Sequence, residues 1–87
     1  MTMANTAAPL SLLAFGATRD MVGGPTCTLY IEEGCTVGQL REQLYQAYPD
    51  LRQLRSLLIA VNEEYGNEAL LVRPTDEVAL IPPVSGG

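Results

Sequence analysis

The residues best suited to take part in a chemical reaction are the last six of this sequence, which are Pro82, Pro83, Val84, Ser85, Gly86 and Gly87. The two prolines restrict the backbone and favour an extended start to this tail. Glycine has no Cβ atom, so the end of the tail is thin enough for a channel that larger side chains would block. We therefore predict that residues 82–86 insert into a partner protein and that the uncrowded α-carboxylate of Gly87 is the reactive group. The alternative is a chain end without a chemical role, since frayed termini are common.

The remaining composition offers few catalytic groups. The 87 residues include no histidine and no lysine, and all five basic residues are arginines. Without histidine there is no Ser-His or Cys-His nucleophile pair and no imidazole metal site, and without lysine there is no Schiff-base chemistry. The two cysteines cannot supply the four ligands of an iron–sulfur cluster. We expect no bound cofactor, no metal and no catalysis by this chain alone, so nucleophiles and metals should belong to partner proteins.

The charge balance and the N-terminal segment limit the partners further. Ten acidic residues against five basic ones give a net charge of −5, which disfavours binding to nucleic acid. Residues 1–18 carry no charged side chain, yet their apolar runs are far shorter than the roughly 20 residues of a membrane span. No basic residue precedes Arg19, as a secretory signal would require. We expect a cytoplasmic protein that binds no membrane, with residues 1–8 as a flexible leader.

The two cysteines, Cys27 and Cys35, are eight positions apart. In an extended chain their Cα atoms would be about 25 Å apart, well beyond the limit of about 7 Å for a disulfide. We expect two small, reduced residues, and a persulfide relay through Cys27 is the weaker alternative.

The segments before the tail predict a single α+β domain over residues 9–81. A capping box at Thr36 and Gln39 precedes an apolar stripe, so we expect a helix that begins after Thr36 and ends before Pro49. Short apolar runs bounded by turn residues predict about five strands, at 10–15, 26–31, 57–61, 69–72 and 77–81. Short helical turns are expected at 17–22 and around 51–54. The result is a mixed sheet covered by one main helix, with one parallel strand pair implied by the helical crossover.

The end of this sequence, Asp-Glu-Val-Ala-Leu-Ile-Pro-Pro-Val-Ser-Gly-Gly over residues 76–87, closely resembles a known family. The family is the small subunits of molybdopterin synthase, which are ubiquitin-like sulfur carriers with a β-grasp fold. The resemblance covers about residues 10–87, with supporting segments at 15–23, 36–40 and 60–65. It departs from the family where Leu80 and Ile81 replace an aromatic residue before the two prolines, and where residues 73–76 replace a glycine-containing turn.

The resemblance implies a reaction sequence for the tail. An E1-like adenylyltransferase would use ATP to adenylate the Gly87 carboxylate, and sulfur would then replace AMP to give a thiocarboxylate. The tail would next enter the large subunit of molybdopterin synthase and donate its sulfur to a pyranopterin precursor, forming the dithiolene that binds molybdenum. The family acts as a heterotetramer of two small and two large subunits.

Three residues outside the tail are candidate partner contacts. We expect Arg19 to contact a partner near the tail. We also expect Val78 and Leu80, with Val84, to form an apolar contact patch at the tail base, because exposed apolar strand surface often marks an interface. The alternatives are a solvated arginine and a strand face that lies under the helix.

Three further functions remain open. The chain could carry sulfur for thiamine, cysteine or tRNA thiolation, although thiamine-type carriers usually lack the Pro-Pro pair. It could be a ubiquitin-like modifier that is joined to lysines of other proteins, or a β-grasp binding module with an idle tail. Because the chain contains no lysine, no lysine side chain of the same chain can attack an activated tail.

Overall fold

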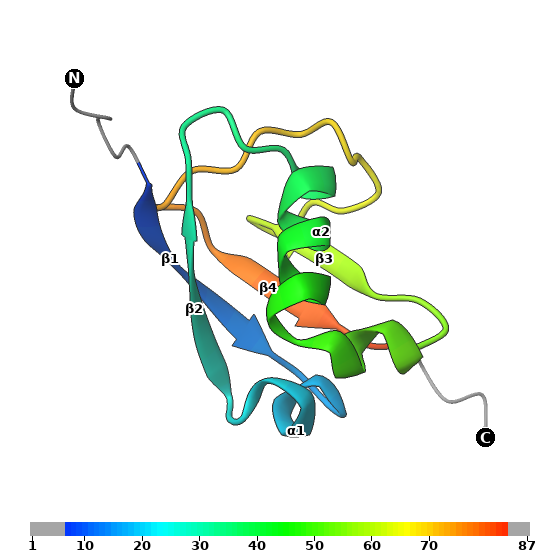
Figure 1. Ribbon diagram of the computed structural model, residues 1–87. Coiled ribbons are helices and arrows are strands. Elements are labelled where there is room, and N and C mark those ends of the chain that lie inside the picture. Colours follow the sequence, from blue (N-terminus) through cyan, green and yellow to red (C-terminus); the bar gives the residue numbers. More distant parts are fainter. Residues whose placement is uncertain (1–6, 84–87) are drawn as a thin grey trace.

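The computed structural model describes residues 7–83 (Figure 1). Val84, Ser85, Gly86 and Gly87, which include the predicted reactive carboxylate, lie outside the described residues, as do residues 1–6 of the predicted leader. The elements follow one another along the chain in the order β1 (Ala8–Ala14), α1 (Thr18–Val22), β2 (Thr26–Ile31), α2 (Val37–Ala47), the 3-10 helix η1 (Pro49–Gln53), β3 (Leu58–Val61) and β4 (Val78–Ile81).

The four strands form one mixed sheet in the order β2-β1-β4-β3. β1 is antiparallel to β2 and parallel to β4, and β4 is antiparallel to β3. α2 crosses one face of this sheet, so the domain has two layers (Figure 1). The predicted α+β class and main helix are confirmed. The parallel pair is β1 and β4 and not, as the helical crossover led us to expect, the two strands that α2 joins. The strands that α2 joins, β2 and β3, run in the same direction but lie at opposite edges of the sheet.

The predicted strand at residues 69–72 is wrong, and the described residues hold four strands where we expected about five. Leu71 makes a single antiparallel bridge to Thr36. The backbone of this segment bonds the residues around the start of α2, since the Val37 N–H donates to Leu70 O and the Val72 N–H donates to Cys35 O. Because its backbone bonds these residues, the segment does not join the sheet as a strand. β1 also begins at Ala8, two residues before the predicted start at Leu10.

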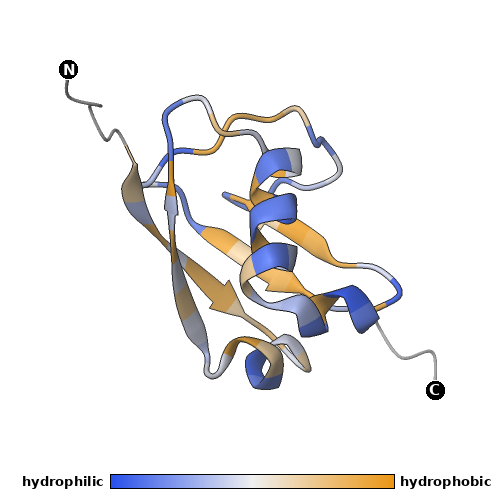
Figure 2. Cartoon of the chain, in the orientation of Figure 1, coloured by the Kyte–Doolittle hydropathy of each residue, from blue (hydrophilic) through white to orange (hydrophobic). Residues whose placement is uncertain are grey.

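The core lies between the sheet and α2. Leu10, Leu12 and Ile31 of the sheet pack with Leu40 and Leu44 of α2, and all five side chains are buried. Figure 2 shows the hydrophobic strands behind a helix whose outer side is hydrophilic. The predicted capping box starts this helix: the Gln39 N–H donates to Thr36 Oγ1, and the Thr36 N–H donates to Gln39 Oε1.

An ion pair ties α2 to the long connection between β3 and β4. Arg41 donates to both carboxylate oxygens of Glu68, from Nε at 2.9 Å and from Nη2 at 2.8 Å. Its remaining nitrogen, Nη1, donates to Leu57 O at 2.5 Å. The Arg41 hydrogen bonds hold the pKa of the Glu68 carboxyl below its ordinary value. This contact therefore stabilises the helix against the connection that precedes β4.

Candidate functional site

The base of the tail is held by the turn between β1 and α1. Pro82 follows β4 directly, and Gly16 of the turn lies against its ring. Gly16 has a φ of +57°, and a Cβ atom at this position would come within 3.0 Å of Pro82 Cγ. Glycine is therefore favoured here by its backbone conformation and by the close approach of the proline. The tail starts from a fixed point beside this turn.

Thr18 secures the same turn from inside the domain. Its side chain is fully buried, and its hydroxyl donates to Phe15 O at 2.5 Å and lies 3.5 Å from Leu80 O. The Phe15 N–H donates to Leu80 O at 3.1 Å, which joins the turn to the last strand. Our sequence analysis did not single out Thr18, because a lone threonine between apolar residues gives no signal of such a role.

Arg19 lies beside this junction, and its side chain is exposed. Its Nε donates to Ala14 O at 3.2 Å, which directs the guanidinium along the end of β1. Within residues 7–83 its two terminal nitrogens make no hydrogen bond, so they are available to an acidic group from outside. The position suits the predicted partner contact, which stays a prediction.

The predicted contact patch at Val78 and Leu80 is wrong. Both side chains are 0% exposed, because β4 lies inside the sheet and α2 covers the face on which they lie. Neither can meet a partner at the surface. The third member of that predicted patch, Val84, lies outside the described residues. The next residues along β4, Ala79 and Ile81, point to the opposite face and are partly exposed.

That opposite sheet face, which we call the outer face, carries an apolar hollow of about 260 Å³. Leu13 of β1 and Ala60 of β3 pair on either side of Ala79 and form its floor. Phe15, which is 44% exposed, and Tyr65, which is 65% exposed, stand at its rim. Ile81, Glu63 and Glu77 complete the lining.

The outer face has the features of a docking surface. Two aromatic rings surround small side chains, and exposed apolar patches of this kind mark interaction sites. Phe15 and Ile81 lie at the end where the tail leaves, whereas Glu77 lies at the start of β4. Sequence reasoning missed Leu13 and Phe15, although strand alternation from the buried Leu10 and Leu12 places both on this face.

The two cysteines are free thiols, in agreement with our expectation. Burial raises the pKa of the Cys27 thiol, although a hydrogen bond from Tyr48 acts in the opposite direction. Burial likewise raises the pKa of Cys35. A raised pKa lowers the thiolate fraction, so neither environment activates a nucleophile.

Among residues 7–83 there is no group of three or more side chains that could hold a metal ion. Within the same range, no helix is long and apolar enough to cross a membrane. The tail base, Arg19 and the part of the outer face formed by Phe15 and Ile81 lie together at one end of the sheet.

A small mixed sheet under one helix, with an inner strand that leads into a Gly-Gly tail, defines the ubiquitin-like β-grasp class. The chain belongs to the ThiS family, whose sequence profile matches residues 12–87. It is 37% identical over 79 residues to the molybdopterin synthase sulfur carrier subunit of Arabidopsis thaliana, covering 90% of this chain and 82% of that protein. The human protein of the same name is 32% identical over 82 residues, covering 90% and 93%.

Solved structures agree on the fold. SAMP1 from Haloferax volcanii superimposes with a TM-score of 0.76 at 26% identity, covering 92% of this chain and all of that chain. A protein–protein complex of subunits 1 and 2 of the molybdopterin-converting factor from Helicobacter pylori contains a similar chain, with a TM-score of 0.61 at 21% identity. That match covers 92% of this chain and 100% of the other, and at this identity it speaks for the fold alone.

Proposed function

We propose that this chain is the sulfur carrier subunit of a molybdopterin synthase. The observation that carries the proposal is the family match, which continues from residue 12 through the tail to Gly87. The relatives in plants and humans bear the name of that subunit. The scarcity of catalytic groups in the chain suits a protein that other enzymes load and unload.

In the proposed reaction, an E1-like enzyme joins the Gly87 carboxylate to AMP and releases pyrophosphate from ATP. The product is a mixed anhydride and therefore a good acyl donor. The terminal sulfur of a donor enzyme's persulfide attacks the acyl carbon and AMP leaves, which gives an acyl disulfide. A second thiol then attacks the donor's sulfur, so that a disulfide forms on the donor and the Gly87 thiocarboxylate is released. The loaded tail then passes its sulfur to a pyranopterin precursor bound by the large subunit.

We further propose that the outer face docks on the large subunit while the tail enters its active site. Phe15 and Ile81 lie next to the tail base, so contact there would place Pro82 and Pro83 at the channel mouth. Arg19 would pair with an acidic side chain of the partner. Since the activating enzyme needs the same tail, the two partners would bind in succession.

A second candidate is a protein modifier, in which Gly87 is joined to a lysine of another protein. SAMP1 stands for small archaeal modifier protein 1, and the similarity to the SAMP1 structures, at 25–26% identity, favours this reading. The tail chemistry up to the adenylate would be the same, and the acceptor would differ.

Reconstitution with the large subunit separates the two candidates. The chain is loaded by its activating enzyme, ATP and a sulfur donor, and then mixed with the large subunit and the pyranopterin precursor. The sulfur carrier proposal predicts dithiolene product in proportion to loaded chain and no product from chain shortened by Gly87. Absence of product together with high-mass adducts on lysines would instead support the modifier.

A further inference from the structure

Within residues 7–83, no strand pairs with the outer edge of β2. β2 is an edge strand, and Pro9 of β1 stands opposite Tyr30. Proline has no N–H, so this pair lacks the two hydrogen bonds of a bonded antiparallel pair. At the other end of the ladder, the Ala14 N–H donates to Pro25 O. Because bonded and unbonded pairs alternate, both observations direct the N–H and C=O groups of Thr28 and Tyr30 away from β1.

Most of these edge groups have no partner. Within the described residues, neither group of Thr28 makes a hydrogen bond, nor does the Tyr30 N–H. Tyr30 O accepts a bond of 2.7 Å from the Gln43 side chain of α2. Exposed edges are normally guarded by charged residues or proline, yet β2 contains neither between Thr26 and Ile31. Another strand can therefore pair with this edge. The Gln43 amide donates to Tyr30 O, the acceptor that a backbone N–H of the added strand would otherwise use.

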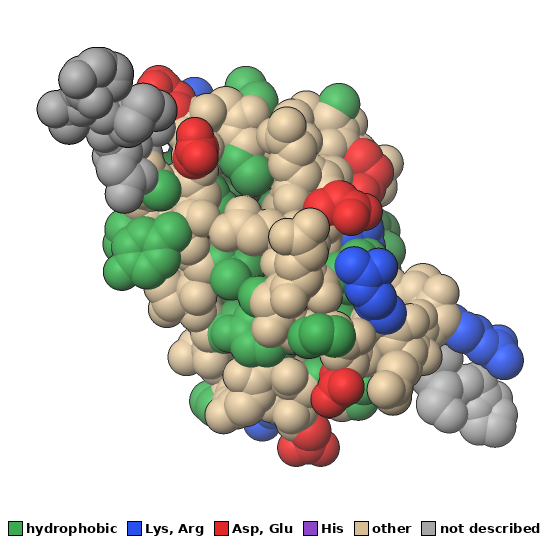
Figure 3. Space-filling model, viewed as in Figure 1, with side chains coloured by type: hydrophobic (Ala, Val, Ile, Leu, Met, Phe, Trp, Pro, Cys, Tyr) green, Lys and Arg blue, Asp and Glu red, His purple; other side chains and the backbone are tan. Residues whose placement is uncertain are grey.

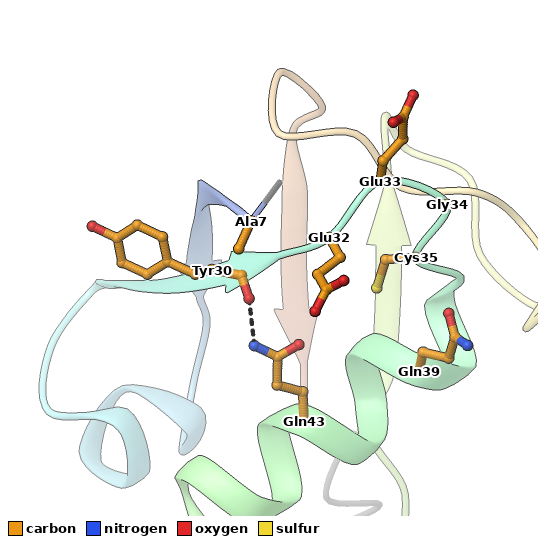
Figure 4. Close-up of a pocket in the computed structure, with 8 residues that line it drawn as sticks. All are labelled: Ala7, Tyr30, Glu32, Glu33, Gly34, Cys35, Gln39 and Gln43. Atoms are coloured by element: carbon orange, nitrogen blue, oxygen red, sulfur yellow. Dashed lines mark hydrogen bonds between the residues drawn. The ribbon is translucent and has the colours of Figure 1, made fainter. Parts of the chain in front are cut away.

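A groove runs along this edge between the end of β2 and α2. It has a volume of about 510 Å³ and is lined by Ala7, Tyr30, Glu32, Glu33, Gly34, Cys35, Gln39 and Gln43. Figure 4 shows the Gln43 amide reaching Tyr30 O, with Glu32 beside it. Figure 3 shows acidic side chains near the end of β2 and hydrophobic side chains in the hollow between β2 and α2.

The acidic side chains at the groove favour a basic occupant. Glu32 and Glu33 are both exposed carboxylates, and the lining holds no basic side chain. Glu33 also borders a neighbouring hollow together with Arg73, whereas Glu32 lines this groove and not that hollow. A second copy of the chain would bring another net charge of −5 to this edge, so self-pairing is disfavoured.

We propose that the outer edge of β2 binds an extended basic peptide segment of another protein by strand addition. The peptide backbone would bond Thr28 and Tyr30, and its Lys or Arg side chains would meet Glu32 and Glu33. The site is independent of the sulfur carrier role. It lies beside the start of β1, whereas the tail leaves beside the end of β1, so both sites can be occupied together.

The test is an NMR titration of the full chain with synthetic peptides. The probe is a peptide of about eight residues that alternates valine and threonine between terminal arginines. We expect amide hydrogen exchange at Thr28 and Tyr30 to slow by about tenfold or more. The Leu29 amide, which faces β1, serves as the internal control and should not change. A matched peptide with terminal glutamates should bind about tenfold more weakly.

Two helix variants sharpen the test. Gln43→Ala removes the side chain that a peptide must displace, so it should tighten binding by about two- to tenfold. Gln46→Ala, an exposed glutamine on the same helix outside the groove, should leave binding unchanged.

Three results would overturn the proposal. The first is no protection of Thr28 and Tyr30 at millimolar peptide, and the second is equal binding of the arginine and glutamate peptides. The third is protection that rises with protein concentration without peptide, which would assign the edge to a second copy.

Discussion

Gly16 and Pro82 approach each other so closely that a single Cβ atom on Gly16 would come within 3.0 Å of Pro82 Cγ. This contact joins the first turn of the chain to the base of its tail. Thr18 and the backbone of Phe15 reach the last strand at the same place. The direction in which the tail leaves the domain therefore depends on residues far from it in sequence.

Gly16→Ala should separate this positioning role from simple backbone strain. Alanine at a φ of +57° costs about 1–2 kcal/mol and must also push Pro82 aside. Gly34→Ala is the matched control, because it has a φ of +85° but nothing within 4 Å of the added Cβ. Denaturant unfolding should show both variants destabilised, while sulfur transfer to the large subunit should slow only in Gly16→Ala. Equal transfer rates would show that the contact does not position the tail.

Thr18→Val should destabilise the domain by about 1 kcal/mol, because it removes the buried hydroxyl bonded to Phe15 O. Thr18→Ser keeps that hydroxyl and serves as the comparison. Thermal unfolding of the two variants measures the difference. If the Thr18→Val variant is as stable as the native protein, the hydroxyl contributes nothing to the stability of the turn.

Phe15→Glu should weaken binding to the large subunit by about tenfold or more, because it places a charge in the apolar outer face. Leu71→Ala is the control, since Leu71 is an exposed hydrophobic residue that does not line that face. Calorimetric titration gives both affinities. The outer face is not the docking surface if Phe15→Glu binds as tightly as the control.

Glu68→Gln should lower stability near neutral pH by about 0.5–1 kcal/mol, the range for a half-exposed pair. Arg41 holds the folded-state pKa of Glu68 below its ordinary value. Its contribution is therefore complete above the unfolded-state pKa and is lost as the pH falls through the lower folded-state pKa. Urea midpoints of native and variant chains should differ at pH 7 and converge once the pH falls below the folded-state pKa of Glu68. Glu42→Gln, on the exposed side of α2, should show no such difference.

The local signals of the sequence were reliable where the structure depends on neighbouring residues. Thr36 and Gln39 predict the start of α2 because a capping box is made within one turn. Residues 69–72 look like a strand by composition, yet their backbone bonds go to Cys35 and Val37, which no local pattern reveals.

The surface of the site was harder to predict for the same reason. Alternation shows that Val78 and Leu80 share a face, but the position of α2 decides which face is buried. Phe15 becomes part of the site only because β1 and β4 are parallel neighbours. The prediction for the tail rests on its residue types and on the family resemblance, and it stays a prediction because Gly86 and Gly87 lie outside the described residues.

The most direct test of the central claim is the intact mass of the chain after incubation with its activating enzyme, ATP and a sulfur donor. The account predicts a gain equal to the exchange of one oxygen for one sulfur, with fragmentation locating it at Gly87. The chain shortened by Gly87 should stay folded and gain nothing. An unchanged mass in the full chain, or a gain located at Cys27 or Cys35, would contradict the account.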